Sequence, residues 1–362
     1  MKLSKSTKTS FMTYGVVIVM YALLMILTSA GVMSSTMKGL LVPCCAYIIA
    51  ALSLNLTVGV LGELSLGHAG FMSVGAFTGT TVAMLLKTSV EPVWVRMLIA
   101  IAVGAFFAAI AGVIVGIPVL RLRGDYLAIV TLAFGEIIKT IVTNLYVGSD
   151  NDGVRMGFLN ADIGLKTGGK MILNGPNGIS GITKISTLTT GFVLIMVCLV
   201  VIFNLVNSRS GRAIMALRDN RIAAESVGIN VTKYKLMAFV ISAAMAGAAG
   251  ALYALGQNTV TANKFDFNTS ILILVYVVLG GLGNMLGSIV AATVLYLLPE
   301  TVLRQFSDYR MLIYAVVLII IMLVTNNARL KSLFSRAVEP ITRLFGRGRD
   351  KDGGGKAEKE GR

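Results

Sequence analysis

Charged residues are scarce in this chain. Asp, Glu, Lys and Arg make up 14% of its 362 residues, whereas they account for about 25% of a typical soluble domain. The apolar residues gather in continuous runs of roughly 18 residues or more, the length that a helix needs to cross a bilayer. Because these runs are continuous rather than alternating, they favour membrane-spanning helices over a β-barrel.

Groups that bind metals or act as nucleophiles are almost missing as well. The chain has one histidine, His68, and three cysteines, Cys44, Cys45 and Cys198, which all fall within apolar runs. Their spacing matches neither a disulfide framework nor a metal site. The sequence has no G-x-x-x-x-G-K-[ST] motif, so the chain does not bind ATP in the P-loop manner. We therefore expect no catalysis by this chain alone, no metal and no cofactor.

The apolar runs predict an all-α polytopic membrane protein with about ten transmembrane helices. Lys2, Lys5 and Lys8 precede the first run, which we interpret as an uncleaved span rather than a signal peptide. With the N-terminus inside, most basic residues fall on the inner side, as the positive-inside rule requires. That rule accounts for the net charge of +15 without a nucleic-acid partner. The predicted spans are 11–32, 39–60, 66–86, 94–119, 126–147, 189–207, 235–256, 268–282, 284–299 and 309–326.

The apolar run 268–299 is long enough to form either one tilted span or two short ones. The sequence "GGLGNMLG" (280–287) interrupts the run 268–299, and its glycines disfavour a continuous helix. We therefore predict two short spans there. The whole chain then divides into a cytoplasmic N-terminus (1–10), a transmembrane domain (11–326) with a polar external loop (148–188) and a basic cytoplasmic loop (208–234), and a basic, disordered cytoplasmic tail (327–362).

A few polar groups lie inside the predicted spans. Glu136 and Lys139 are three residues apart and can pair on one helical face, either as a structural pair or as part of a transport pathway. His68 stands in a glycine-rich stretch, where we expect it to form hydrogen bonds rather than to bind a ligand. The small-residue spacings at Gly75-x-x-x-Gly79 and Ser242-x-x-x-Ala246-x-x-x-Gly250 predict closely packed helices.

The most polar helical stretch is "GRAIMALRDNRIAAESVGINVTKYK" (211–235). Ser210 can cap a helix start, and Gly228 suits the left-handed position after a helix end, so we predict one helix over 211–228. Such a helix can lie flat on anionic lipid. Its small residues beside charges also fit a helix that is seated in the groove of a partner protein.

This stretch resembles the cytoplasmic coupling loop of bacterial ABC importer permeases, written E-A-A-x-x-x-G. Ala223, Ala224 and Gly228 match that pattern, whereas Ile222 stands where the pattern has Glu. More narrowly, the chain is similar to the permeases of branched-chain amino-acid importers, of the type with the longer external loop. The stretches that carry the resemblance span most of 40–300: "LSLNLTVGVLGELSLGHAGFMSVGAF" (52–77), "RLRGDYLAIVTLAFGEI" (121–137), "NGPNGISGI" (174–182), the stretch 211–254 and "LGGLGNMLGSIVAATVL" (279–295).

The resemblance implies a non-catalytic permease with the ten-helix bundle of type II importers, in the bacterial inner membrane with both termini cytoplasmic. Its implied partners are cytoplasmic ABC ATPase subunits, a second homologous permease, an external substrate-binding protein and the lipid bilayer. The implied substrates are leucine, isoleucine and valine. Permeases for urea or short-chain amides look similar, and an ion-coupled secondary transporter is the rival of a different class. A membrane enzyme would need a polar catalytic cluster, which the sequence does not offer.

Two sets of residues follow as candidate sites. For coupling to the ATPase, the resemblance indicates the helix 211–228 and within it Arg218, Arg221, Ala223, Ala224, Glu225 and Gly228. For the translocation pathway, the glycine-rich and charged positions of the spans suggest Gly67, His68, Gly70, Gly75, Glu136, Gly280, Gly281 and Gly283.

Overall fold

The computed structural model describes residues 5–301, apart from 32, 88, 123, 151–152, 161 and 166–168, together with residue 319. Met1–Arg304 form one compact unit. The tail predicted at 327–362 lies outside the described residues, as does the tenth span predicted at 309–326 except for residue 319.

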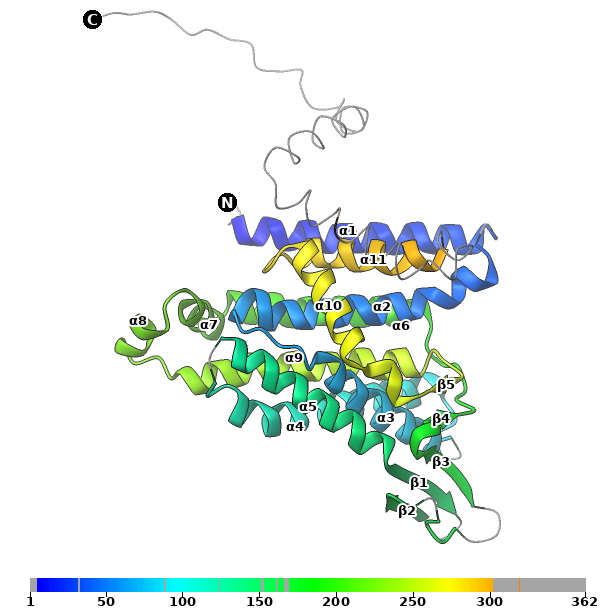
Figure 1. The fold of residues 1–362 in the computed structure, drawn as a ribbon. Coiled ribbons are helices and arrows are strands. Elements are labelled where there is room, and N and C mark those ends of the chain that lie inside the picture. The colour runs from blue at the N-terminus through cyan, green and yellow to red at the C-terminus, as the bar shows by residue number, and fades with distance from the viewer. Residues whose placement is uncertain are drawn as a thin grey trace, which may run out of the picture. The chain divides into compact units, whose positions relative to one another are not determined.

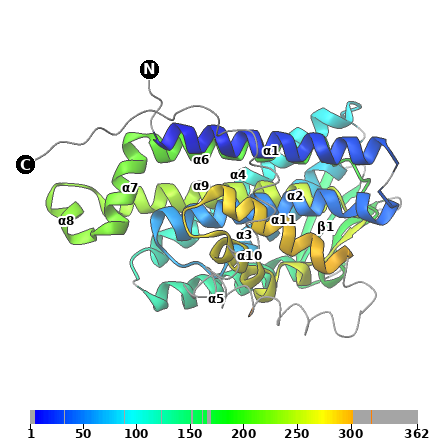
Figure 2. The same ribbon diagram turned by 90° about the horizontal axis from the view of Figure 1, so that it is seen from above.

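Long helices form a bundle in this unit (Figure 1). Most of them run along a shared direction, and Figure 2 shows the same bundle from above. Seven stretches of the described chain are long and apolar enough to cross a membrane, which confirms the predicted class of an all-α polytopic membrane protein. The helices are α1 (Lys5–Ser29), α2 (Ser35–Asn55), α3 (His68–Leu85), α4 (Val93–Val119), α5 (Asp125–Thr143), α6 (Leu188–Asn207), α9 (Val231–Ala254), α10 (Phe267–Gly280) and α11 (Met285–Thr301).

The core of the bundle is built around α9, which packs on α2, α3 and α4. Small residues make this close packing possible, because lipid provides no hydrophobic drive between helices and contact area must hold them. A Cβ atom on Gly75 of α3 would overlap the backbone carbonyl of Gly247 of α9. The predicted small face of α9 is confirmed, since Ser242, Ala246 and Gly250 are all buried.

Two breaks interrupt the helices of the bundle. After α2 the chain continues as a π-helix, η1 (Leu56–Leu61), and then without helical structure through 62–67 to the start of α3. The second break, between α10 and α11, confirms the predicted division of 268–299 into two helices. Residues 56–67 are called the break segment below.

A small antiparallel sheet lies at one end of the bundle, where the sequence analysis predicted only a polar loop (Figure 1). The strand order is β2-β1-β3-β4-β5. Leu173 and Ile179, which fall within the predicted loop, are buried in the sheet, as is Val147, which the span prediction included. The prediction of a helix up to 147 was therefore wrong as well. The elements are β1 (Leu145–Asp150), β2 (Gly153–Phe158), β3 (Lys170–Asn174), η2 (Gly175–Asn177), β4 (Ile179–Ser180), β5 (Thr259–Val260) and η3 (Ala262–Phe265).

The polar stretch between α6 and α9 lies at the opposite end of the bundle (Figure 1). It forms two helices, α7 (Arg209–Asp219) and α8 (Arg221–Ser226), so the prediction of one helix over 211–228 was wrong. Asn220 adopts an extended backbone (φ −154°) between them, and its side chain accepts a hydrogen bond from the Ala223 N–H at 3.0 Å. An asparagine that caps a new helix start competes with continuation of the previous helix.

The outer ends of this polar stretch are also defined by caps. The hydroxyl of Ser208, not that of Ser210, accepts from the Gly211 N–H at 3.0 Å and caps α7. Gly228 has a φ of +86°, which confirms its predicted left-handed position. The two helices and the connection to α9, residues 208–230, are called the α7–α8 segment below.

Candidate functional site

Helical structure stops at the end of η1, so backbone groups of the break segment beyond it lack helical hydrogen-bond partners. Hydroxyl groups of other helices bind these groups instead. The Leu66 N–H donates to the hydroxyl of Thr131 on α5 at 3.0 Å, and the Ala69 N–H donates to the hydroxyl of Ser270 on α10 at 3.1 Å. The break segment and the start of α3 are therefore fastened to α5 and α10.

Asn55, the last residue of α2, connects the two breaks. Its side-chain oxygen accepts from the Gly283 N–H at 2.8 Å, and its side-chain nitrogen donates to the Ser288 hydroxyl at 2.9 Å. Gly283 has a φ of +80° in the turn between α10 and α11. Because Asn55 is fully buried, these two bonds satisfy an amide that would otherwise be costly in the membrane interior.

A third set of hydroxyl bonds joins α2, the break segment, α3 and α9. The Thr57 hydroxyl donates to the Ser242 hydroxyl at 2.8 Å, and the Ser242 hydroxyl donates to the Ser53 carbonyl at 2.6 Å. The Ser53 hydroxyl lies 2.5 Å from Nε2 of His68. His68 is thus buried and hydrogen-bonded, as expected, whereas its place in the translocation pathway stays a prediction.

Arg218 of α7 reaches from the α7–α8 segment to the break segment. Its guanidinium donates to the Gly59 carbonyl at 3.0 Å and also pairs with Asp219 at 3.1 Å. Gly59 lies in the last turn of η1, where carbonyls lack helical partners and attract cations. Gly62 (φ +81°) leaves room for this contact, because a Cβ atom there would meet the aliphatic part of Arg218.

A buried ion pair makes the second connection between the same parts. Lys235, in the first turns of α9, pairs with Glu63 of the break segment. The two side chains are only 7% and 15% exposed. No local sequence pattern predicts this pair, since the partners are 172 positions apart. Together with Arg218 at the end of α7, it attaches the break segment to the α7–α8 segment and to the start of α9 that follows.

The α7–α8 segment has an inner and an outer side. Ala224 packs with Leu217 and Val231 in a small apolar cluster, so its small size serves packing within the segment. The outer side is exposed and carries Ala223, Glu225 and Gly228. It also carries two apolar side chains that the sequence analysis did not select, Ile222 at 81% exposed and Val227 at 76%.

A cleft of about 400 Å³ lies between helices α7 and α8 on one side and the break segment on the other. Arg221 lines it, and the Nε of this arginine is buried without a hydrogen-bond partner among the described residues. The cleft leaves space beside the Arg218 and Lys235 contacts. Its lining residues are Leu61, Gly62, Glu63, Gly124, Leu217, Arg218, Asp219, Asn220, Arg221, Ile222 and Lys235.

The glycines predicted to line a pathway lie at helix crossings and turns. A Cβ on Gly67 would overlap the Thr131 carbonyl of α5, one on Gly70 would crowd Gly135, and one on Gly280 would crowd Ser288. Gly281 (φ +92°) and Gly283 belong to the turn between α10 and α11. Packing and turn geometry therefore account for Gly67, Gly70, Gly75, Gly280, Gly281 and Gly283.

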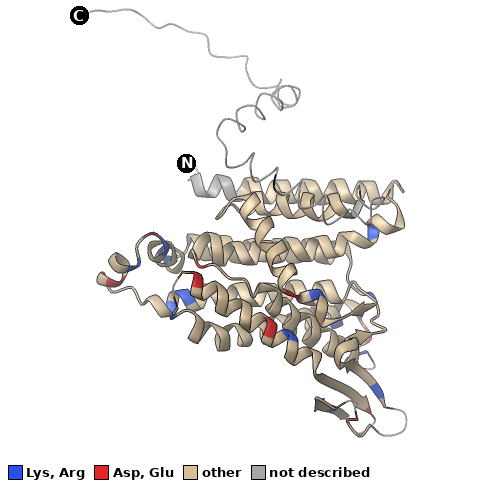
Figure 3. Cartoon of the chain, in the orientation of Figure 1, with Lys and Arg blue, Asp and Glu red and all other residues tan. Residues whose placement is uncertain are grey.

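Glu136 and Lys139 form the predicted ion pair on α5, with Nζ and Oε2 3.2 Å apart. Their side chains are 41% and 23% exposed respectively. In the described chain, charged residues otherwise lie mainly toward the two ends of the bundle (Figure 3). This pair thus places charge at the surface of the bundle within a membrane-spanning helix.

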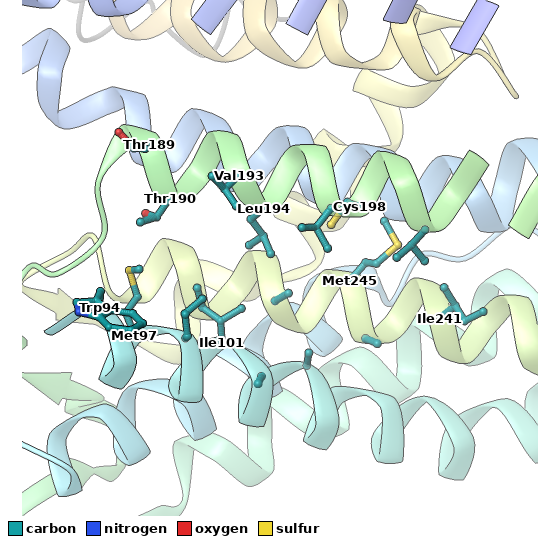
Figure 4. A pocket seen from close by; sticks show the side chains of 17 residues that line it. Trp94, Met97, Ile101, Thr189, Thr190, Val193, Leu194, Cys198, Ile241 and Met245 are labelled. Carbon is teal, nitrogen blue, oxygen red and sulfur yellow. The ribbon is translucent and has the colours of Figure 1, made fainter. Parts of the chain in front are cut away.

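A cavity of about 690 Å³ lies between α4, α6 and α9 (Figure 4). Its lining is apolar apart from a few groups such as Thr189, Thr190 and the Trp94 ring. It contains no charged side chain. A cavity of this composition suits hydrocarbon rather than a charged solute.

The comparisons with known proteins agree with one another. Residues 36–322 match the family model described as branched-chain amino acid transport system / permease component. Two relatives are high-affinity branched-chain amino acid transport system permease proteins LivM, from Salmonella typhimurium and Escherichia coli K12. Each is 36% identical over 311 residues, covering 76% of this chain and 66% of its own length. The chain therefore spans slightly under two thirds of these relatives.

A more distant relative is the ribose import permease protein RbsC of Escherichia coli K12. It is 28% identical over 288 residues, covering 77% of this chain and 82% of its own. No solved structure matches the chain.

Proposed function

The chain belongs to the family of permease components of branched-chain amino acid transport systems, and from this premise we propose that it carries leucine, isoleucine and valine inward as a subunit of an ATP-driven importer. The observation that supports this most strongly is that the family match, 36–322, includes the bundle from α2 to α11. ATP hydrolysis belongs to separate cytoplasmic ABC ATPases. A second homologous permease and an external substrate-binding protein complete the assembly.

The α7–α8 segment is the docking site for an ATPase in this proposal. Ile222, Ala223 and Val227 are apolar side chains on the exposed outer side of the segment, and such side chains fit a groove on a protein partner. Arg221, Glu225 and Gly228 surround them. Ile222, which stands where the family pattern has Glu, thus supplies an additional apolar contact.

Movement of the docked segment reaches the bundle through Arg218 and Lys235. Both bind the break segment, at Gly59 and Glu63. The break segment and the residues beside it bind α5, α10 and α11 through Thr131, Ser270 and Ser288. Coupling requires that the docked segment prefer different arrangements in the two nucleotide states of the ATPase. The neighbouring cleft provides space for the segment to change its position.

The proposed orientation in the bacterial inner membrane follows from the two ends of the bundle. The first described turn of α1 and the α7–α8 segment lie at the same end (Figure 1). That end carries the basic residues of α7 and α8, so we assign it to the cytoplasm with both termini. The sheet then lies on the outer face, where the binding protein docks.

A reconstituted importer tests the docking step. Ala224→Arg is a poor test because Ala224 is buried within the α7–α8 segment. Ala223→Arg instead adds bulk to the exposed side, and we expect ATP-driven leucine uptake to fall about tenfold or more because overpacking weakens the contact. The permease should still be folded and assembled with its partner permease.

The matched control is Ala223→Ser, which keeps a small side chain at the same exposed position. This variant should import leucine as the wild type does. Full uptake by Ala223→Arg would rule out α8 as the docking site. A wild-type complex that hydrolyses ATP but imports no branched-chain amino acid would rule out the substrate.

A further inference from the structure

The Glu136–Lys139 pair is not explained by the packing of the bundle. Glu136 lies in the second half of α5 and is 41% exposed. Charged groups inside a membrane face a protein partner or a water-filled space rather than lipid, because lipid exposure is expensive. This surface of α5 is therefore turned toward an aqueous path or toward the second permease.

The surroundings of the pair combine polar and aliphatic groups. Ile129 and Ala133, seven and three residues before Glu136, lie on the same helical stripe and are exposed. Ile129 is 61% exposed. The stripe thus presents two opposite charges next to an aliphatic surface. A branched-chain amino acid has the same combination of groups, an ammonium and a carboxylate on one carbon beside an aliphatic side chain.

We propose that Glu136 and Lys139 form a subsite for the zwitterion of the transported amino acid. The substrate ammonium pairs with Glu136 and its carboxylate with Lys139, while its side chain lies along Ala133 and Ile129. This inference rests on the proposed function and names the site that recognises the substrate within the membrane.

When the zwitterion replaces the bond between Glu136 and Lys139, each charge gains a new opposite charge, so the net charge of the site stays zero. Before binding, Nζ of Lys139 and Oε2 of Glu136 are 3.2 Å apart and bind one another. An exposed local pair of this kind is weak, so a substrate can replace it at little cost. Binding that is favourable but weak also suits a transporter, because the substrate must leave on the inner side.

A small hollow of about 10 Å³ beside Glu136 is also lined by residues of the break segment and α10. Leu66, at the end of the break segment, and Ser270, which binds the Ala69 N–H, line the hollow together with Glu136. Asp266 lines it too, but its carboxylate accepts from the Thr269 N–H at 3.0 Å and from the Asn268 side chain at 3.1 Å. Asp266 is thus occupied as a helix cap, whereas Glu136 needs only Lys139 to move away.

The competing explanation is a purely structural pair, and two double variants distinguish the two. Glu136→Gln with Lys139→Met removes both charges and leaves no unpaired charge. Glu136→Lys with Lys139→Glu keeps an ion pair but reverses the order of its charges along α5. A structural pair would tolerate both changes, whereas a zwitterion subsite would tolerate neither.

The measurement is uptake of radiolabelled leucine by proteoliposomes containing the complete importer, together with the unfolding temperature of each variant. We expect uptake by both double variants to fall about tenfold or more, with the unfolding temperature unchanged. Thr143→Val, an uncharged change one turn further along α5, is the control and should transport normally.

Wild-type uptake by either double variant would overturn the subsite. If the neutral variant unfolds at a lower temperature, the charge-reversed variant decides, because it retains a pair. The test is separate from that of the proposed function. A wild-type importer that carries no leucine refutes the function itself, whereas normal uptake by the variants refutes only the subsite.

Discussion

Two Lys–Glu ion pairs in this bundle differ in their burial and in the sequence distance between the partners. Lys235 and Glu63 are buried and join α9 to the break segment across 172 positions of sequence. Glu136 and Lys139 are partly exposed and lie three residues apart on α5. The first pair fixes two separate parts of the chain to one another, whereas the second constrains only its own helix.

The difference shows how burial decides what a charge pair can do. Two charges removed from water hold each other firmly, since the loss of one partner leaves an uncompensated buried charge. A local pair near the surface contributes little to stability and opens readily. The buried pair is therefore suited to transmit movement, and the exposed pair is suited to exchange partners.

The largest effect is expected when the buried pair is broken. Lys235→Met leaves Glu63 buried without a cation and should lower the free energy of unfolding by about 3–5 kcal/mol. Chemical or thermal unfolding of the purified permease in detergent micelles measures this loss.

The double variant Glu63→Gln with Lys235→Met is the control for that experiment. It leaves no buried charge, and we expect it to recover most of the lost stability. If Lys235→Met alone were as stable as the wild type, the pair would not hold the break segment in place.

An intermediate effect is expected at Arg218, which is less buried than Lys235 but also binds the break segment. Arg218→Met removes the bond to the Gly59 carbonyl and should cost about 1–2 kcal/mol. We expect a larger loss in leucine uptake per ATP hydrolysed than in ATP hydrolysis itself. Arg218→Lys, which keeps a cation at this position, should retain more of the coupling, and equal uptake per ATP in all three proteins would contradict this role.

The smallest effect on stability is expected at the exposed pair. Lys139→Met should change the free energy of unfolding by about 1 kcal/mol or less. The same unfolding assay, run beside Lys235→Met, compares the two pairs directly. A loss as large as that of Lys235→Met would remove the contrast between a pair that fixes the structure and one that can exchange.

The sequence predicted those features that depend on neighbouring residues. The long apolar helices, the break at 281–284 and the Glu136–Lys139 pair all follow from local hydropathy, glycine content or helical spacing. The left-handed conformation of Gly228 follows in the same way. Each of these signals lies within a short stretch of chain, where periodicity and spacing are informative.

Features that depend on distant residues could not be predicted from one sequence. The bonds of Arg218 to Gly59, of Lys235 to Glu63 and of Asn55 to Ser288 each join positions more than 150 residues apart. The division at Asn220 had a local signal, an asparagine with cap potential, but the helical pattern on both sides concealed it. The sheet also had a local signal, namely the apolar residues of β1 and β3.

The bonds of Asn55 have a consequence for the order in which this protein is made. Its partners Gly283 and Ser288 follow it by 228 and 233 residues. At about 5–20 residues per second, the ribosome needs roughly 10 to 50 seconds to reach them. During that interval a polar amide at the end of α2 has no partner from the second half of the chain, so the insertion machinery or water must solvate it. The arrival of α11 is then the event that completes the first half of the bundle.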